Sequence, residues 1–116
     1  MGADKLDMRF YIAGLYDLYG PVLTEKQRRI YEMHDLQDLS LSEISDELGI
    51  SRQGISDQLQ RARDRLEELE NILGFFERSV VWDRVYTDVL SLVDLEKDRL
   101  PSDFISEIRA ILSEAD

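Results

Sequence analysis

The chain has no cysteine, one histidine and two prolines among its 116 residues. Without cysteine, neither a disulfide nor a thiolate metal site can form, and one histidine leaves no ligand set for structural zinc. No apolar run approaches the roughly 18 residues that a membrane span needs, and the N-terminal stretch MGADKLDM lacks the apolar core of a signal peptide. We therefore expect a cytoplasmic protein with no metal site, no cofactor and no membrane span.

The sequence also lacks the residue groupings that catalysis requires. It has no glycine-rich phosphate loop, no nucleophile with a base beside it and no paired acid and base. His34 has no second histidine or cysteine to act with, and it reads as a surface or half-buried residue. The acidic residues Glu67, Glu68 and Glu70 fall on the outward faces of a predicted helix, where solvated carboxylates are expected. We predict that the protein is not an enzyme.

Composition and periodicity predict an all-α fold. Hydrophobic residues make up 43% of the chain and charged residues 34%, as in soluble helical proteins, and 116 residues fit one domain. A helix over residues 5–19 ends at Gly20-Pro21, and a second helix, capped by Thr24, runs to about Leu36. The candidate core residues are Leu6, Phe10, Tyr11, Ala13, Leu15 and Leu18 in the first helix and Ile30, Tyr31 and Met33 in the second.

Residues 41–66, LSEISDELGISRQGISDQLQRARDRL, have the pattern of a helix-turn-helix. Ser40 and Glu43 form a capping box before the first helix. Gly49 can take the positive φ that the turn needs, and Ser51 stands where the second helix requires an N-cap. The apolar residues that hold the two helices together are predicted to be Leu41, Ile44, Leu48, Ile50, Ile55 and Leu59.

The second helix of this motif presents polar side chains outward, at the positions where recognition helices read bases. Arg61, Arg63 and Arg65 either contact phosphates or pair with the carboxylates at residues 67–70, and the sequence leaves both readings open. Asp57 has the wrong sign for phosphates, although a carboxylate can accept from a cytosine amino group. The candidate nucleic-acid-binding residues are Arg52, Gln53, Ser56, Gln60, Arg61 and Arg65.

Apolar residues continue past the motif at alternating spacings of four and three, from Ile55 to Val80, as in a heptad repeat. A straight helix over residues 51–80 would be about 45 Å long, so another helix must cover its distal half. We expect a second copy of the chain to do so in a homodimer. The alternative is an intramolecular cover by the helix of residues 5–19 or by a helix over residues 82–93. The predicted dimer seam is Leu66, Leu69, Leu73, Phe76 and Val80.

We predict one helical domain over residues 1–116, with a helix-turn-helix core at residues 24–66 and an extended, dimer-forming helical part at residues 67–116. The apolar register slips after Val80, so a bend is expected near residues 79–81. Ser102, after Leu100-Pro101, is expected to cap a last helix. The predicted buried residues of this part are Trp82, Tyr86, Val89 and Val93, followed by Phe104, Ile105, Ile108 and Leu112.

The net charge of −11 is unevenly distributed along the chain. Residues 1–23, 24–66 and 67–116 contribute −1, −2 and −8, so most of the excess acid lies outside the helix-turn-helix. Binding to a duplex draws much of its affinity from the neutralisation of phosphates, and an acidic chain has a weak electrostatic footprint for it. The charge lowers the expectation of nucleic-acid binding without excluding it.

The segment LTEKQRRIYEMHDLQDLSLSEISDELGISRQGISDQLQRARDRL resembles region 4 of bacterial sigma factors, which binds the −35 promoter element through its recognition helix. The chain has no room for the −10-binding region of a sigma factor, and Ser56-Asp57 stand where that class is usually basic. A closer resemblance is to the YlxM family of small bacterial helix-turn-helix proteins. It is carried by LYG-x-x-LTEKQR and SRQG, and it covers approximately residues 10–77.

This resemblance implies a non-enzymatic regulatory protein of the signal recognition particle pathway, because the family is encoded beside the GTPase of that particle. The implied partners are nucleic acid, either DNA or the particle's RNA, and the particle's protein or its receptor. A promoter-binding transcriptional regulator is the alternative that the sigma-like motif suggests. A further alternative is a helical protein-interaction module that no longer binds nucleic acid, which Asp57 and the acidic C-terminal part favour.

Overall fold

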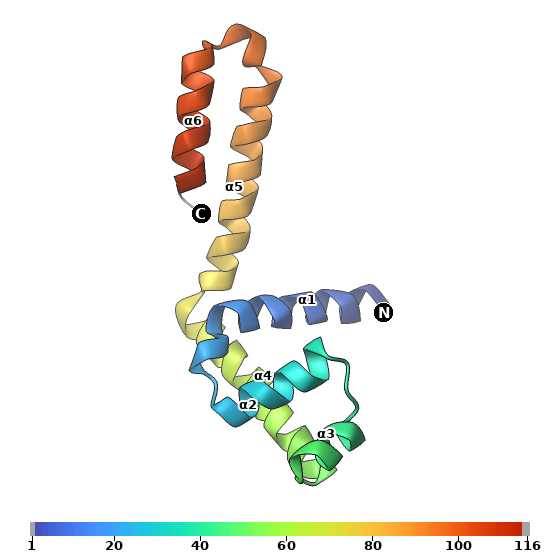
Figure 1. Cartoon of the computed structure of the whole chain (residues 1–116). Helices are drawn as coiled ribbons and strands as arrows, with labels where there is room; N and C mark the ends of the chain where they lie inside the picture. Colours follow the sequence, from blue (N-terminus) through green and yellow to red (C-terminus); the bar gives the residue numbers. More distant parts are fainter. Residues whose placement is uncertain (1, 115–116) are drawn as a thin grey trace. The chain divides into compact units, whose positions relative to one another are not determined.

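The computed structural model describes residues 2–114, with side chains from residue 8 onward. Over this range the chain is all-helical, as the sequence predicts (Figure 1). Most connections between the helices are single residues or one short turn, so little of the described chain lies outside helical structure. The elements, in order, are α1 (Gly2–Tyr19), a 3-10 turn (Gly20–Val22), α2 (Glu25–Tyr31), a π-helix (Glu32–Leu36), α3 (Leu41–Leu48), α4 (Arg52–Leu73), α5 (Phe75–Leu95), a second 3-10 turn (Lys97–Arg99) and α6 (Ser102–Glu114).

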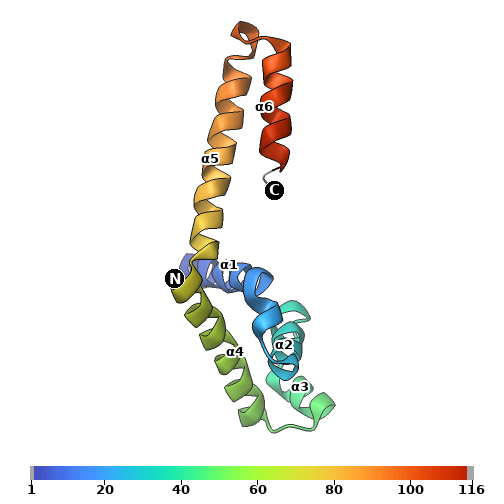
Figure 2. The same ribbon diagram turned by 90° about the vertical axis from the view of Figure 1, so that its left-hand side faces the viewer.

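The chain forms two compact units, Met1–Phe76 and Glu77–Asp116, which we call unit 1 and unit 2. In unit 1, α1, α2 and α3 pack on α4, and α2 and α3 lie beside the first half of α4 in both ribbon views (Figures 1 and 2). In unit 2, α6 runs antiparallel to α5 as a hairpin. The one-domain organisation stays a prediction, because compactness alone does not say whether two units unfold together.

The helix starts predicted after Thr24 and Ser40 are confirmed, whereas α1 begins at Gly2 and not at residue 5. Thr24 and Ser40 each cap a helix through a complete capping box, with Gln27 and Glu43 as the reciprocal residues. The 3-10 turn that contains Pro21 follows the end of α1. These local signals are strong because each supplies a partner for a backbone N–H that the helix leaves unpaired.

The core of unit 1 gathers where α1, α2 and α3 meet α4. Ile30, Tyr31 and Met33 are buried as predicted, and Leu15 is fully buried. Phe10 and Leu18, also expected in the core, are 68% and 43% exposed. That prediction was wrong because α1 buries a narrow face rather than a wide arc. The buried core residues are Ile12, Leu15, Tyr19, Leu23, Ile30, Tyr31, Met33, Ile44, Ile55, Leu59, Ala62, Leu66 and Leu69.

The break in the long heptad pattern lies at Gly74. This residue takes φ +67° as the C-cap of α4 and donates its N–H to the Glu70 carbonyl across 2.8 Å. The bend expected near residues 79–81 was therefore placed too late, and no single helix carries the apolar seam from Ile55 to Val80. A glycine is needed here because other residues rarely adopt this left-handed conformation.

Glu70 is buried, with 8% of its surface exposed, although the sequence analysis placed it on solvated helix surface. The carboxylate accepts a hydrogen bond from the Tyr19 hydroxyl and another from the backbone N–H of Phe76. The expectation of a solvated face holds for Glu67 and Glu68, which are exposed. It fails for Glu70 because polar partners from other segments replace water around the charge.

The helices of unit 2 bury less than their apolar pattern predicts. Val93 is buried, but Trp82 and Phe104 are 41% and 45% exposed, and the other predicted core residues of this part are half-buried. A hairpin of two helices can cover only one side of each helix, which explains why these predictions were wrong. Ser102 is the first residue of α6 rather than the residue that caps it.

Candidate nucleic-acid interface

The turn between α3 and α4 has the geometry that the sequence predicts. Gly49 takes φ +69°, and its N–H donates to the Ser45 carbonyl across 2.9 Å. The Ser45 hydroxyl donates to the carbonyl of Ile50 across 2.5 Å, and Ser51 caps α4 by accepting from the N–H of Gly54 at 3.0 Å. These bonds fix the direction in which α4 leaves the turn.

Gly54 allows the turn and the first turn of α4 to approach closely. A Cβ atom built on Gly54 would lie 2.8 Å from the Cγ2 methyl of Ile50, nearer than real side chains approach. Ile55, the next residue, is fully buried against the core. This close approach fixes the position of the exposed N-terminal turn of α4 within unit 1. A ligand of that turn would therefore contact a rigidly held surface.

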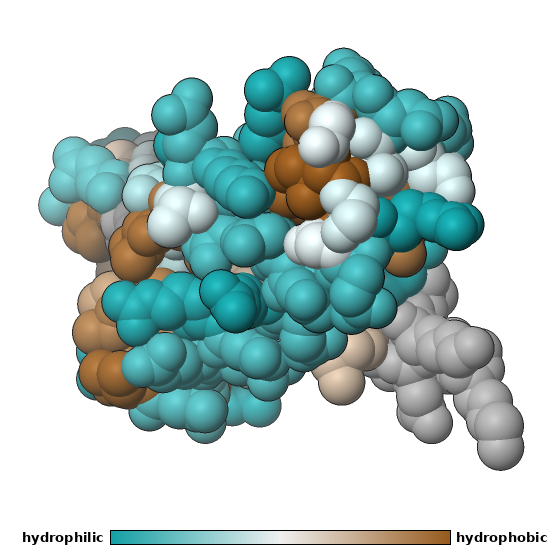
Figure 3. Space-filling model, turned by 90° about the horizontal axis from the view of Figure 1, so that it is seen from below, coloured by the Kyte–Doolittle hydropathy of each residue, from teal (hydrophilic) through white to brown (hydrophobic). Residues whose placement is uncertain are grey.

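The N-terminal half of α4 presents a polar surface to solvent. Of the predicted binding residues, Ser56 is half-buried and the rest are exposed. Seen from the side of unit 1 where α3 meets α4, hydrophilic side chains cover most of the face, and hydrophobic ones form separate patches (Figure 3). The exposed predicted residues are Arg52, Gln53, Gln60, Arg61 and Arg65.

Two carboxylates on this helix are held by neighbouring amides. The Gln53 side-chain amide donates to Asp57, and that of Gln60 donates to Asp64, both across 2.9 Å. Each pair is one helical turn apart, where side chains are neighbours on the helix surface. Because an amide has no net charge, neither aspartate has a cationic partner in these bonds, and the face carries acidic as well as basic side chains.

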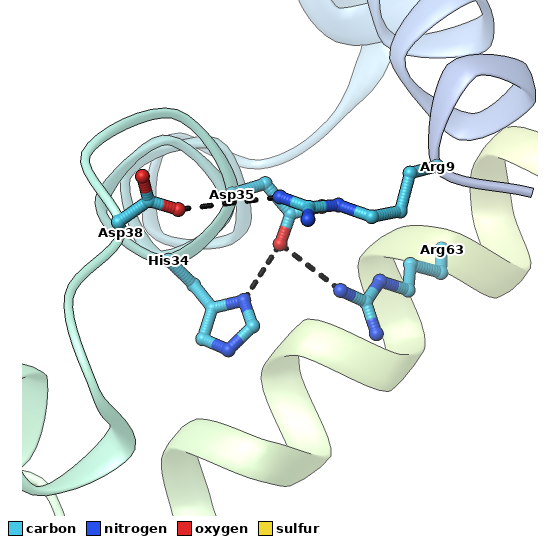
Figure 4. A network of polar contacts seen from close by, with 5 residues as sticks. All are labelled: Arg9, His34, Asp35, Asp38 and Arg63. Carbon is cyan, nitrogen blue, oxygen red and sulfur yellow. Dashed lines mark hydrogen bonds and ion pairs between the residues drawn. The ribbon is translucent and has the colours of Figure 1, made fainter. Parts of the chain in front are cut away.

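The arginines of α4 divide into paired and unpaired ones. Arg63 donates to Asp35 across 3.0 Å, and His34 lies 2.6 Å from the same carboxylate oxygen (Figure 4). Arg65 pairs with Glu68 at 3.2 Å. Arg52 and Arg61 make no ion pair with any residue that the structure describes. Of the two readings left open by the sequence, pairing with the carboxylates at residues 67–70 holds for Arg65, whereas Arg63 pairs with Asp35 instead. For Arg61, which has no ion-pair partner among the described residues, phosphate contact stays a prediction.

The sequence analysis did not include the cations of α2 among the candidate residues. Lys26 and Arg29 are exposed and, like Arg28, form no ion pair within the described part of the chain. The signal for them was present in the segment EKQRR, whose charge is largely basic. The apolar residues of α2 give it the pattern of a core helix, and this pattern does not distinguish the cations on its outer side.

The predicted dimer seam is divided by the fold. Leu66 and Leu69 are buried within unit 1, and Phe76 packs partly buried against the same core. Leu73 and Val80 are 38% and 53% exposed. The intramolecular alternative, in which the first helix covers part of this stripe, matches the packing of α1 on α4. Whether the exposed remainder contacts a second copy stays a prediction.

No helix in the described residues is both long enough and apolar enough to cross a membrane.

Comparison with known proteins identifies the family of the chain. The profile of the family UPF0122, described as "Putative helix-turn-helix protein, YlxM / p13 like", matches residues 6–103. A UPF0122 protein of Caldanaerobacter subterraneus subsp. tengcongensis is 56% identical over 64 residues, which are 55% of each chain. One of Symbiobacterium thermophilum is 45% identical over 64 residues, which are 55% of this chain and 60% of the relative.

These two matches span little more than half the length of the curated relatives. A UPF0122 protein of Streptococcus pneumoniae is similar over more of its length, with 32% identity over 103 residues, 88% of this chain and 87% of the relative. The family profile and this long match both include the helix-turn-helix and most of the two units. The chain belongs to the UPF0122 family of YlxM- and p13-like helix-turn-helix proteins.

Proposed function

We propose that this protein is a nucleic-acid-binding regulatory protein of the signal recognition particle pathway, and that the N-terminal half of α4 is its contact surface. The observation that carries the proposal is that Arg52 and Arg61 lie on the exposed face of a capped helix and form no ion pair with any described residue. An arginine fork without an internal partner is free to bind a phosphate or a base edge.

The signal recognition particle enters through the resemblance to the YlxM family. The charge of the chain agrees with a ribonucleoprotein target, because a net charge of −11 disfavours scanning along duplex DNA. A folded RNA is recognised largely by its shape, so a few well-placed arginines suffice. Since the protein is expected to have no catalytic groups, its effect would be on assembly or on GTP turnover by the particle and its receptor.

A promoter-binding transcriptional regulator is the second candidate. It is supported by the exposed position of α4, because the major groove of B-DNA admits a helix whereas that of A-form RNA is too deep and narrow to be read by side chains. A protein-interaction module without nucleic acid is supported by Asp57 and Asp64, which weaken the attraction of this face for phosphates. The three candidates differ in the ligand they predict, and this makes them separable.

We also propose that the protein is a homodimer. The support is the apolar surface left near the end of α4 and along α5, where Ile72, Leu73 and Val80 are 69%, 38% and 53% exposed. Apolar surface of this kind is stabilised when a second copy covers it. Leu66 and Leu69 contribute to the fold of unit 1 instead.

The test is a titration of the full chain against three probes: the RNA of the signal recognition particle, a DNA duplex library and the reconstituted particle with its receptor. Binding of the RNA, with a change in GTP turnover, is expected. Arg52→Ala should weaken RNA binding by about 5- to 150-fold, corresponding to about 1–3 kcal/mol. Arg109→Ala, an exposed arginine in unit 2, is the matched control and should leave binding unchanged.

Two results contradict the proposal. Absence of RNA binding at tens of micromolar, together with an enriched DNA site, would favour the promoter-binding candidate. Absence of binding to any nucleic acid, with capture by the particle's protein alone, would favour the protein-interaction module.

A further inference from the structure

A hollow of about 440 Å³ lies between α2 and the helix-turn-helix turn. Lys26 and Arg29 line one side, and Leu48 and Ile50, at the end of α3 and in the turn, line the other. Ile50 is followed by the N-cap Ser51 and then by Arg52, so the hollow borders the end of α4 that carries the unpaired arginine. Glu25 is the one acidic residue among those that line it.

The two cations of this hollow are available to a ligand. Lys26 and Arg29 are three residues apart on α2, a spacing that places side chains on the same side of a helix. Neither forms an ion pair with another residue that the structure describes. The chain contains 25 acidic residues, so a shortage of carboxylates does not explain why Lys26 and Arg29 form no ion pair among the described residues. Elsewhere in unit 1, Arg9, Arg63 and Arg65 do have acidic partners.

The chemistry of the lining fits a phosphodiester. An arginine fork can hold two phosphate oxygens at once, and a lysine beside it adds a second point charge. The apolar side chains of Leu48 and Ile50 offer no competing carboxylate and can contact the sugar next to the phosphate. With Glu25 included, the charged residues of the lining sum to a net charge of +1.

We propose that the hollow bounded by Lys26, Arg29 and Ile50 binds a backbone phosphate of the nucleic acid whose bases face α4. This inference rests on the proposed nucleic-acid binding and adds α2 to the interface. Phosphate contacts of this kind fix the register of a protein on its nucleic acid, whereas base contacts provide the sequence preference. The α2 site would therefore position the ligand, and Arg52 would read it.

The experiment measures the salt dependence of binding. The full chain is titrated by fluorescence anisotropy with a labelled DNA duplex, and with the RNA duplex of the same sequence, from 50 to 300 mM KCl. The double variant Lys26→Ala, Arg29→Ala is compared with Lys97→Ala, Arg99→Ala, which removes one lysine and one arginine from unit 2. Circular dichroism melts check that both variants stay folded. We expect the α2 variant to stay folded because Lys26 and Arg29 are exposed and form no ion pair with any described residue.

The α2 variant should flatten the plot of log affinity against log salt by about 0.9 on B-DNA, since the hollow holds one phosphate and each phosphate contact contributes about 0.9 to the slope. At 0.1 M salt this corresponds to a loss of affinity of roughly 8-fold. The unit 2 variant should leave the slope unchanged. If the site binds a nucleic-acid strand and not a free anion, 10 mM inorganic phosphate should weaken duplex binding no more than chloride at equal ionic strength.

The outcomes separate this inference from the proposed function. Equal changes in the two double variants would mean a general effect of net charge, and would overturn the α2 site. An unchanged slope for the α2 variant, with Arg52→Ala still weakening binding, would overturn the site and leave nucleic-acid binding intact. If the wild-type chain binds neither duplex nor the particle's RNA, both proposals fail. Specific competition by inorganic phosphate would reassign the hollow to a free anion.

Discussion

The Tyr19 hydroxyl donates a hydrogen bond to the buried Glu70 carboxylate across 2.6 Å, and thereby joins the end of α1 to the last turns of α4. The same two groups cap the start of α5: the N–H of Phe75 donates to the Tyr19 oxygen at 3.1 Å, and that of Phe76 donates to Glu70 at 3.0 Å. Burial, and the hydrogen bond to Glu70, raise the pKa of Tyr19. Two side chains distant in sequence thus satisfy the N–H groups that a new helix leaves unpaired.

Removing either group should destabilise unit 1. Tyr19→Phe and Glu70→Ala should each lower the free energy of unfolding by about 1–3 kcal/mol, because a buried polar partner loses its hydrogen bond. Glu70→Gln keeps an acceptor oxygen and should cost less than Glu70→Ala. Urea denaturation followed by circular dichroism measures the difference. Tyr86→Phe, in unit 2, is the control, and equal losses in Tyr86→Phe and Tyr19→Phe would contradict this role for the Tyr19 hydroxyl.

Gly14 is predicted to be intolerant of alanine as long as Phe76 is present. A Cβ atom on Gly14 would lie 2.2 Å from Cε2 of the Phe76 ring, which also packs edge-on against Tyr11 with centroids 5.3 Å apart. Gly14→Ala should therefore cost about 1–3 kcal/mol through overpacking.

The sign of the Gly14 effect should reverse when the ring is removed. In a Phe76→Ala background, Gly14→Ala should stabilise by up to about 1 kcal/mol, the gain expected from helix propensity. A double-mutant cycle from urea denaturation gives both values. Equal effects of Gly14→Ala in the two backgrounds would show that the ring and the glycine do not interact.

Alkaline pH should unfold unit 1 between pH 10 and 12. Burial, followed by the hydrogen bond to Glu32, raises the pKa of Tyr16 to about 12, and burial with the nearby charge of Asp35 raises that of Tyr31 to about 12. An unfolded tyrosine titrates near pH 10, so the unfolded chain loses these protons first. The stabilisation is therefore complete below about pH 10 and is lost as the pH rises through 12.

The measurement is the free energy of unfolding as a function of pH. Tyr16→Phe and Tyr31→Phe should each make the decrease in the free energy of unfolding between pH 10 and 12 shallower. Each substitution removes one tyrosine whose pKa differs between the folded and the unfolded chain. An unchanged steepness in both variants would contradict this assignment.

Arg61 and Arg63, two residues apart on α4, should have opposite consequences when truncated. Arg63→Ala leaves Asp35, whose side chain is only 20% exposed, without its guanidinium, and we expect a loss of stability of about 1 kcal/mol. Arg61→Ala should leave stability unchanged and weaken nucleic-acid binding. Thermal melts and anisotropy titrations of the two variants decide this, and a reversed pattern would remove Arg61 from the proposed interface.

The proposed homodimer should sediment at twice the 13.5 kDa mass of one chain at micromolar concentration. Leu73→Asp and Val80→Asp place a charge on exposed apolar positions and should dissociate it without loss of helicity. Leu69→Asp should unfold unit 1 in any case, since Leu69 is buried in its core. Phe10→Asp, on exposed α1 surface, is the control. A wild-type chain that sediments only as the monomer excludes the dimer.

The helix-turn-helix could be predicted from the sequence because its determinants are local. Gly49 and Ser51 each form a hydrogen bond with a backbone group three or four residues away. The spacing of these residues can therefore be read directly from the sequence. The exposure of Arg52 and Arg61 follows from the same periodicity. Within this segment, the half-buried Ser56 is the one predicted binding residue that the pattern placed too far outward.

The junction at Gly74 could not be predicted in the same way. The heptad spacing runs through it without interruption, and an isolated glycine is compatible with a continuous helix at a cost of only about 1 kcal/mol. The contacts that decide the matter join Tyr19 to Glu70 and Gly14 to Phe76. Such long-range pairs leave no periodic signal, and Glu70 therefore reads as an ordinary surface carboxylate.

The π-helix of residues 32–36 makes unit 1 sensitive to a change in chain length at this place. Its wider turn, closed by the N–H of Gln37 on the carbonyl of Glu32, accommodates one more residue than an α-helical turn would. Deleting a single residue there would remove the extra residue of the wide turn, and the segment would have to close with ordinary α-helical geometry. Asp35 is one of the residues of this turn and pairs with Arg63, so the length of the segment is itself a determinant of how the π-helix contacts α4.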